Sequence, residues 1–555
     1  MDQMDKSNIT SKPNRRGFLK SGMLAGVAAA ASPSPSGRFF VATPAAPAAI
    51  PLVKSFELGE ITVAELQDEM QSGQLTARSV TGKYLARIEN VDKQGPSVNS
   101  LIEVNPDALA LAAELDRERK AKGPRGPLHG IPVLIKDNIA TRDRMMTTAG
   151  SLALVGAQMP KDAFVVKRLR EGGAVILGKT NLSEWANIRS SHSTSGWSGR
   201  GGHTRNPYAL DRNPSGSSSG SAVAVSANFC ALALGTETDG SIISPSCVNG
   251  IVGIKPTLGL VSRAGIIPIA HSQDTAGPMA RTVTDAAILL GVLAGVDPDD
   301  PATEASRRKA PADYTGSLDP SGLRGARIGV ARKFFGISDA LDELMNQAID
   351  VMKRQGAVIV DPADLAKADQ VGDSELLVLL YELKADLNSY LAALGPGTPV
   401  HSLREIIEFN ERNSKKEMPY FGQDLFVKAE AKGSLEEKEY LEALEKNHRL
   451  TREEGIDALL DKFQLDALVA PSGGPAWLTD LVDGDHDSGG SSTPAAVAGY
   501  PNINVPVGFV FGLPAGISFF GRAYSEPALI KLAYAFEQAT RHRRAPQFLP
   551  TAVLT

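Results

Sequence analysis

The chain has 555 residues, of which 42% are hydrophobic and 22% are charged; this balance is that of a globular protein with a core, and it excludes an intrinsically disordered chain. The formal net charge is −5, and because there is no basic tail and no basic stripe with interleaved aromatic residues, we expect no nucleic-acid partner. The two cysteines, Cys230 and Cys247, are too few for a disulfide framework and lack metal-ligand spacing, so we expect two buried thiols, although an oxidising compartment would permit one disulfide.

The first 49 residues have the order of a bacterial export signal. A charged segment at 14–20 precedes a short apolar run at 22–31, and Pro/Ser/Ala-rich sequence follows. The Arg15-Arg16 pair before Phe18-Leu19-Lys20 resembles a twin-arginine signal, which implies the twin-arginine export machinery as a partner and a periplasmic or secreted protein. The apolar run is too short for a membrane span, so no stable membrane association is expected. The alternative is a disordered basic N-terminus of a cytoplasmic protein.

The next part of the chain alternates helical patterns with short apolar runs. Thr62 and Glu65 form a capping-box pattern that predicts a helix over 63–71, and Thr76 opens a second helix. Further helices are predicted over 106–122, 164–171 and 222–229. Short apolar runs predict buried strands over 131–135, 174–177 and 231–234. This alternation indicates an α/β fold with a largely parallel or mixed sheet.

Residues 311–462 differ from the rest of the chain. They contain longer, charged, helix-patterned segments such as 340–354 and 435–450, so we predict a helical layer or cap over the same sheet. Strand patterns return at 465–469 and 503–507, and an amphipathic helix is expected over 526–541. With no repeat and no clear interdomain linker, the sequence favours a single domain over 50–555.

A Ser/Gly-rich segment, 213–221, lies between two ordered-looking parts of the chain. A flexible linker is the simple interpretation, but the segment runs directly into an apolar helix, and glycines beside serines let the backbone approach a ligand closely. The segment also contains Gly216-x-Ser218-x-Gly220, the nucleophile-elbow pattern of α/β-hydrolases. That elbow requires a preceding strand, and residues 211–214 do not form a central strand pattern, so we discount it.

Two further segments carry groups suited to catalysis. In 234–242, which follows a predicted strand, Gly240 before Ser241 permits a tight turn whose backbone N–H groups can stabilise an oxyanion. Lys136 follows the buried run 131–135 directly, and burial there would lower the pKa of its amine toward neutrality and let it act as a base.

Together these segments resemble the amidase signature family. Lys136-Asp-Asn, a Gly-Ser-Ser-Ser-Gly loop and a Thr-Asp-Gly-Ser-Ile loop match its motifs; the segments 250–257, 277–286 and 499–508 resemble further landmarks. The resemblance implies a large, mixed, twisted β-sheet covered by helices on both faces. It also implies roles for particular residues: Ser241 as the nucleophile, Ser217 as a bridging serine on a cis peptide, Lys136 as the base, and the backbone N–H groups of Thr238, Asp239, Gly240 and Ser241 as the oxyanion hole. The chain departs from many members in having Asp239 where they have glycine.

The run 126–138, with 146–150 after it, is most similar to the bacterial peptide amidases, which implies a small-molecule or peptide amide substrate. A glutaminase like the A-type subunit of tRNA-dependent amidotransferases is the alternative within the family. A catalytically inactive binding protein and an α/β-hydrolase esterase are alternatives from other classes. No cofactor is expected, and no metal, because none of the eight histidines forms a metal-binding pair. His129 and His192 are near the motifs only in sequence.

Overall fold

The computed structural model describes residues 53–311 and 313–554, which belong to one compact unit. The predicted export signal at residues 1–49 lies outside the described residues. The strands of the main sheet are β1 (Leu101–Val104), β2 (Pro132–Lys136), β3 (Val175–Thr180), β6 (Leu232–Glu237), β7 (Val252–Lys255), β8 (Thr275–Ala280), β9 (Arg327–Val330), β10 (Val358–Val360), β11 (Ala467–Pro471), β12 (Asn502–Val510) and β13 (Leu513–Phe520). A separate pair consists of β4 (Trp197–Ser198) and β5 (Gly202–His203).

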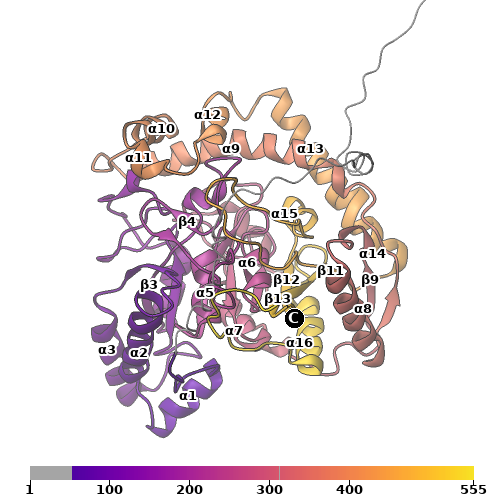
Figure 1. Cartoon of the computed structure of the whole chain (residues 1–555), viewed down its shortest axis with the longest axis horizontal. Coiled ribbons are helices and arrows are strands. Elements are labelled where there is room, and N and C mark those ends of the chain that lie inside the picture. Colours follow the sequence, from indigo (N-terminus) through magenta and orange to yellow (C-terminus); the bar gives the residue numbers. More distant parts are fainter. Residues whose placement is uncertain (1–52, 312, 555) are drawn as a thin grey trace, which may run out of the picture. The chain divides into compact units, whose positions relative to one another are not determined.

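The main sheet is mixed, as predicted, and has 11 strands in the order β1-β3-β2-β6-β8-β7-β12-β13-β11-β9-β10 (Figure 1). Strand β2 runs parallel to both of its neighbours, β3 and β6, whereas β8, β7, β12 and β13 pair in antiparallel fashion. Because β2 and β6 are parallel neighbours, their carboxyl ends meet at one edge of the sheet. The last residues of these strands, Lys136 and Glu237, therefore lie at the same end of the sheet.

Helices cover both faces of the sheet, as predicted (Figure 1). The α-helices are α1 (Val63–Ser72), α2 (Ala77–Arg87), α3 (Ala108–Lys122), α4 (Phe164–Glu171), α5 (Ser219–Ser226), α6 (Ile243–Val248), α7 (Val283–Leu293), α8 (Asp339–Arg354), α9 (Gly372–Ala393), α10 (Leu403–Arg412), α11 (Ser414–Glu417), α12 (Asp424–Glu430), α13 (Lys438–Thr451), α14 (Asp457–Phe463), α15 (Thr493–Ala498) and α16 (Glu526–Thr540). Helices α5 and α6 contact each other and the central strands, while α7 contacts both α4 and α16. Helices α9 to α13 form the layer drawn in orange in Figure 1.

Several helix boundaries confirm the local sequence rules. Helix α1 begins with the predicted capping box, in which the N–H of Glu65 donates to Oγ1 of Thr62 (3.2 Å) and the Glu65 side chain accepts from the Thr62 N–H (2.8 Å). It ends at Gly73, whose φ of 81° lies in the left-handed region that favours glycine. Helix α4 spans the predicted residues 164–171, and α16 ends one residue before the predicted 541.

Two regions differ from the sequence-based expectation. Residues 311–462 are mainly helical, but they also contribute β9 and β10, which pair in parallel at one edge of the main sheet. These strands have only four and three residues and lie among charged helices, so their apolar runs are too short to be recognised. The helix predicted over 222–229 instead covers Ser219–Ser226, because it continues into the serine-rich segment.

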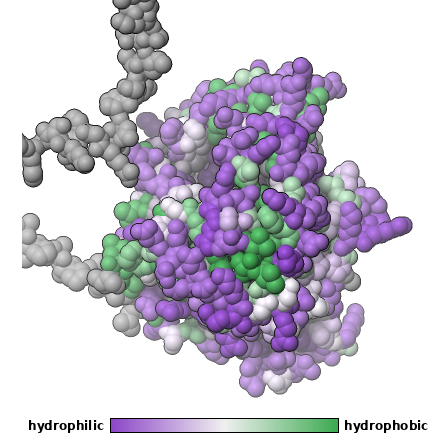
Figure 2. Space-filling view, turned by 90° about the vertical axis from the view of Figure 1, so that its right-hand side faces the viewer, coloured by the Kyte–Doolittle hydropathy of each residue, from purple (hydrophilic) through white to green (hydrophobic). Residues whose placement is uncertain are grey.

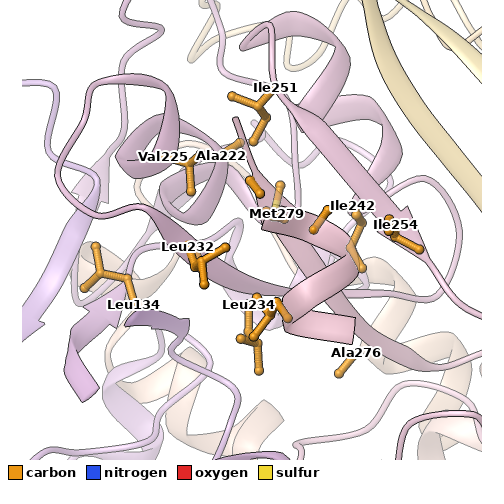
Figure 3. Close-up of a cluster of buried hydrophobic side chains, with 14 of the residues drawn as sticks. Leu134, Ala222, Val225, Leu232, Leu234, Ile242, Ile251, Ile254, Ala276 and Met279 are labelled. Atoms are coloured by element: carbon orange, nitrogen blue, oxygen red, sulfur yellow. The ribbon is translucent and has the colours of Figure 1, made fainter. Parts of the chain in front are cut away.

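The centre of the core lies beneath the site-bearing strands. Leu134 of β2, Leu232 and Leu234 of β6 and Met279 of β8 are fully buried, and Figure 3 shows them in one cluster of buried side chains that also includes Val225 of α5. Burying one such side chain contributes roughly 1.5–3 kcal/mol, so this cluster makes β2 and β6 a rigid support. Both cysteines are buried free thiols.

The outer surface is mostly hydrophilic on the face that carries the β9–β10 edge, with a limited hydrophobic area near its centre (Figure 2). At that edge, Val358 of β10 is 45% exposed. Among the described helices, none is both long and apolar enough to span a bilayer.

Candidate active site

Lys136 ends β2 with its side chain fully buried. Its Nζ donates to Oγ of Ser217 (2.8 Å), Oγ of Ser218 (3.1 Å), and Oγ1 and the carbonyl oxygen of Thr236 (2.9 and 3.2 Å). Burial lowers the pKa of Lys136 to about 7, and the carboxyl groups of Asp274 and Glu237 oppose that shift. Within residues 53–311 and 313–554, no carboxylate forms an ion pair with this amine. Lys136 can therefore lose its proton near neutral pH and accept one from a neighbouring hydroxyl.

The serine-rich segment 213–221 is an ordered loop that brings Ser217 to this amine. The peptide bond between Gly216 and Ser217 is cis. A Cβ added to Gly216 would lie 2.1 Å from Oγ of Ser183, so the close approach of the two segments requires glycine. The carbonyl oxygen of the buried Ser217 accepts a hydrogen bond from the N–H of Ser183 (3.1 Å), which ties the loop to the neighbouring segment.

The turn 238–241 follows β6 and carries Ser241. Gly240 has a φ of +75°, as its place in a tight turn requires. The Glu237 carboxylate accepts hydrogen bonds from the N–H groups of Ile242 (2.7 Å) and Ile243 (3.0 Å), which fixes the turn from behind. In the described part of the chain, the N–H groups of Asp239, Gly240 and Ser241 donate no hydrogen bond. They can therefore bind an oxygen that becomes negatively charged during a reaction.

Ser241 lines a cavity of about 370 Å³ together with Gly216, Thr238, Asp239 and Gly240. The Ser241 side chain is only 8% exposed, and its hydroxyl has no hydrogen-bond partner among the described residues. The serine loop and the turn are joined through the backbone, because the Ser218 N–H donates to the carbonyl oxygen of Ser241 (3.2 Å). No hydrogen bond is formed between the side chains of Ser217 and Ser241 in the described residues.

Residues of α9 and α15 hold the turn 238–241 in place. Oδ2 of Asp239 accepts a hydrogen bond from Thr493 at the start of α15 (2.6 Å). Glu375 of α9 is buried beside Asp239, and burial together with the Asp239 charge keeps the Glu375 pKa well above its usual range. Gln273 donates to both Oε1 of Glu375 (2.9 Å) and the carbonyl oxygen of Thr238 (3.3 Å). The residue that departs from the usual glycine is thus part of a hydrogen-bonded support.

Comparison with known proteins shows the family. The family model described as Amidase matches residues 79–530, which is most of the chain. The chain belongs to the amidase family. A probable amidase of Arabidopsis thaliana is 43% identical over 90% of this chain and 94% of that protein. The A-type subunit of the glutamyl-tRNA(Gln) amidotransferase of Halorhodospira halophila is 35% identical over 88% of this chain and 99% of that protein.

Solved structures agree with this assignment. The native peptide amidase of Stenotrophomonas maltophilia is 52% identical to this amidase, with a TM-score of 0.85 over 89% of this chain and all of that one. The predicted resemblance to the amidase signature family and its peptide amidases is confirmed, and the chain is an amide-hydrolysing enzyme.

The amidase brings together some of the predicted residues and leaves others apart. Lys136 contacts Ser217, and Ser241 lies on the turn with Thr238, Asp239 and Gly240. Ser218, the serine of the elbow pattern, is fully buried and donates to the carbonyl oxygen of Thr236 (3.0 Å), so it faces away from the cavity that contains Ser241. His129 is buried against the carbonyl oxygen of Leu115 (3.0 Å), and neither His129 nor His192 lines this cavity.

Sequence patterns gave no role to several residues of the site. Thr236 supplies two of the oxygens around the Lys136 amine. It lies two residues after the strand predicted over 231–234, and this position was the available signal. Oδ1 of Asp274 accepts from Oγ1 of Thr238 (2.6 Å), and burial raises the pKa of Asp274 to about 6. Asp485 and Asp487 also line the cavity, but they come from a loop more than 240 residues after Ser241, and no local pattern connects them to the motifs.

Two groups of described side chains have the composition of a metal site, and one of them consists of Asp480, Asp483 and His486. The other group includes two residues of α9. His271, Glu382 and Asp386 place ligand atoms within 4.8 Å of one another. However, Nδ1 of His271 already lies 2.9 Å from Oδ2 of Asp386, and Glu382 accepts hydrogen bonds from Tyr440 (2.8 Å) and the Ser272 N–H (2.9 Å). These hydrogen bonds already engage the atoms that would bind a metal. They connect the segment before Asp274 to α9.

Proposed function

We propose that this amidase hydrolyses carboxylic amides through an acyl-enzyme on Ser241, with Ser217 as the proton relay and Lys136 as the base. The observation that carries the proposal is the fully buried Lys136 amine, 2.8 Å from Oγ of Ser217 and with a pKa near 7. A neutral amine at this position can accept the Ser217 proton while Ser217 takes the proton of Ser241. The side chains of Ser217 and Ser241 then have to close to hydrogen-bond distance when substrate binds, as catalytic hydrogen bonds often do.

The two half-reactions follow from this relay. Oγ of Ser241 forms a bond to the amide carbonyl carbon, and the N–H groups of the 238–241 turn stabilise the negative charge on the carbonyl oxygen. The C–N bond then breaks, and the proton held by Lys136 returns through Ser217 to the leaving ammonia or amine. Water then loses a proton along the same route and attacks the carbonyl carbon of the acyl-enzyme. The bond from that carbon to Oγ of Ser241 breaks, the proton held by Lys136 returns through Ser217 to this oxygen, and the acid is released. This is the serine triad logic with lysine in place of histidine.

We propose C-terminal peptide amides as the substrate class, and the support is the 52% identity to a peptide amidase over nearly the whole chain. Incubation of the protein with dipeptide amides, simple aliphatic and aryl amides, and free glutamine should release ammonia chiefly from the peptide amides, as measured by a coupled ammonia assay. Hydrolysis of simple amides without hydrolysis of any peptide amide would reject the substrate class and leave the amidase activity intact.

A glutaminase like that of the tRNA-dependent amidotransferases is the second candidate, because the Halorhodospira halophila relative is 35% identical over 88% of the chain. Glutamine in the same panel separates the two candidates. Ammonia release from glutamine that exceeds release from every peptide amide would favour the glutaminase.

We also propose that the protein is exported, and the support is the Arg15-Arg16 pair with the apolar run after it. In a bacterial host with a twin-arginine system, the wild-type protein should appear in the periplasmic fraction, and a variant with both arginines changed to lysine should stay in the cytoplasm. Immunoblots of the two fractions measure this. Equal distribution of the wild type and the double variant would contradict export by this route.

A further inference from the structure

The cavity that contains Ser241 carries negative charge without a matching cation. Three carboxylates line it, those of Asp239, Asp485 and Asp487, and its lining contains no lysine, arginine or histidine. Within the described ranges, none of the three carboxylates forms an ion pair with a basic side chain. Burial raises the pKa of all three carboxyl groups, so the cavity has a negative potential beside Ser241 at a pH above those raised values.

In the part of the chain that the structure describes, a neighbouring cavity has fewer unpaired carboxylates than the Ser241 cavity. It has a volume of about 490 Å³ and shares Thr238 and Ile269 with the first cavity. Three of its four acids form ion pairs: Asp300 with Arg263 (2.5 Å), Asp386 with His271 (2.9 Å) and Asp299 with Lys161 (2.5 Å). The fourth, Asp274, accepts hydrogen bonds from Thr238 (2.6 Å) and from the N–H groups of Ile269 and Ala270. Among the described residues, the Ser241 cavity thus has three carboxylates without a basic partner, whereas the neighbouring cavity has one.

The three carboxylates of the Ser241 cavity are held in different ways. Asp485 is fixed by the Ser195 N–H (3.0 Å) and by Nε1 of Trp477 (3.3 Å), which also lines the cavity. Asp239 is held by Thr493 (2.6 Å). Asp487 is exposed, and the hydrogen bond that its side chain accepts comes from the backbone N–H of Gly489 (3.1 Å). Asp487 is therefore the carboxylate most available to a substrate.

The same cavity contains a buried hydroxyl, that of Ser241, without a hydrogen-bond partner in the described chain, which indicates a ligand site. Ser241 is more than nine-tenths buried, lines this cavity, and has no side-chain hydrogen bond in the described residues. A cationic group bound within a few bonds of a carbonyl at Ser241 would lie among these carboxylates and beside the indole of Trp477, whose ring face also attracts cations.

We propose that the Ser241 cavity selects amides that carry a positive charge close to the scissile bond, and that Asp487 is the main residue that recognises this charge. The inference rests on the proposed amidase activity at Ser241. The cation can be a basic side chain on the residue that bears the amide or a free α-amino group. A substrate carboxylate at the same place would be repelled, so acidic residue amides should be poor substrates.

The test compares Nα-acetyl-arginine amide with Nα-acetyl-citrulline amide, which replaces the guanidinium with a neutral urea of similar shape. We expect kcat/KM to favour arginine by about tenfold, mainly through KM, and the preference to decrease in high salt. Asp487→Asn should reduce the ratio to about twofold. Asp483→Asn is the matched control, because Asp483 is an exposed acid of the same loop that does not line the cavity, and it should leave the ratio unchanged.

Two further substrate pairs locate the charge that is recognised. A preference for leucine amide over Nα-acetyl-leucine amide that is lost in Asp487→Asn would assign recognition to the α-amino group, and a preference for glutamine amide over glutamate amide would show the repulsion. Thermal unfolding of each variant checks that its fold is intact. Equal kcat/KM for arginine and citrulline amides, with equal rates for leucine amide and its acetylated form, would overturn the charge selection while leaving the amidase activity standing. Absence of ammonia from every amide would instead reject the proposed function.

Discussion

Replacing Ser241 with alanine is expected to reduce ammonia release by a factor on the order of 10⁵, because no acyl-enzyme can form without the hydroxyl and only the backbone N–H groups and substrate binding remain. The free energy of unfolding should change little, since Oγ of Ser241 makes no hydrogen bond within the described chain. Steady-state rates on a peptide amide measure the first effect, and thermal unfolding measures the second. Trapping of radiolabelled acyl groups on the wild type but not on Ser241→Ala would identify the covalent step directly.

The contrasting variant is Ser218→Ala. Ser218 is buried, provides one of the four oxygens around the Lys136 amine, and does not line the cavity with Ser241, so its loss should cost only about tenfold. If Ser218→Ala were inactive and Ser241→Ala were active, Ser218 would be the nucleophile and the α/β-hydrolase interpretation would replace the present one.

The second large effect is expected from Lys136. Only the neutral amine can accept a proton, so kcat/KM should be highest above pH 7 and should fall as the pH decreases through the pKa of about 7. At about pH 6, roughly one tenth of the maximal kcat/KM should remain. Lys136→Ala should lose a factor of roughly 10⁴ at all pH values, because the relay then has no base. The measurement is kcat/KM from about pH 5 to 9 with a peptide amide that lacks ionisable groups.

Lys136→Arg is the informative control for this prediction. A guanidinium keeps its proton at any pH that the protein tolerates, so this variant should be inactive across the whole range although it keeps hydrogen-bond donors near Ser217. A wild-type profile that is flat between pH 5 and 9, or an active Lys136→Arg enzyme, would contradict proton transfer to Lys136.

The local elements and the turn that carries Ser241 could be predicted because interactions between neighbouring residues determine them. The capping box at Thr62 and Glu65 set the start of α1, and the buried apolar run before Lys136 predicted both a strand and a lysine in a dry environment. Gly240 before Ser241 predicted the turn, and its positive φ is observed. In each case the information lies within a few consecutive residues.

The rest of the site depends on contacts between distant segments. Glu375 reaches the Asp239 turn from a helix within the charged region 311–462, and Asp485 and Asp487 come from a loop without a motif. The short strands β9 and β10 are stabilised by pairing with the sheet and not by their own composition. Such residues are defined by tertiary packing, which one sequence does not reveal.

The hydrogen bond between Thr493 and Asp239 has a consequence for biosynthesis. Lys136 and Ser241 are translated in the first half of the chain, but the hydroxyl that holds Asp239 belongs to a residue in the last eighth. A nascent polypeptide still attached to the ribosome therefore lacks a support of the turn that carries Ser241 until most of the chain has been made. We therefore expect a chain that ends before Thr493 to hold the turn 238–241 less firmly than the complete protein does.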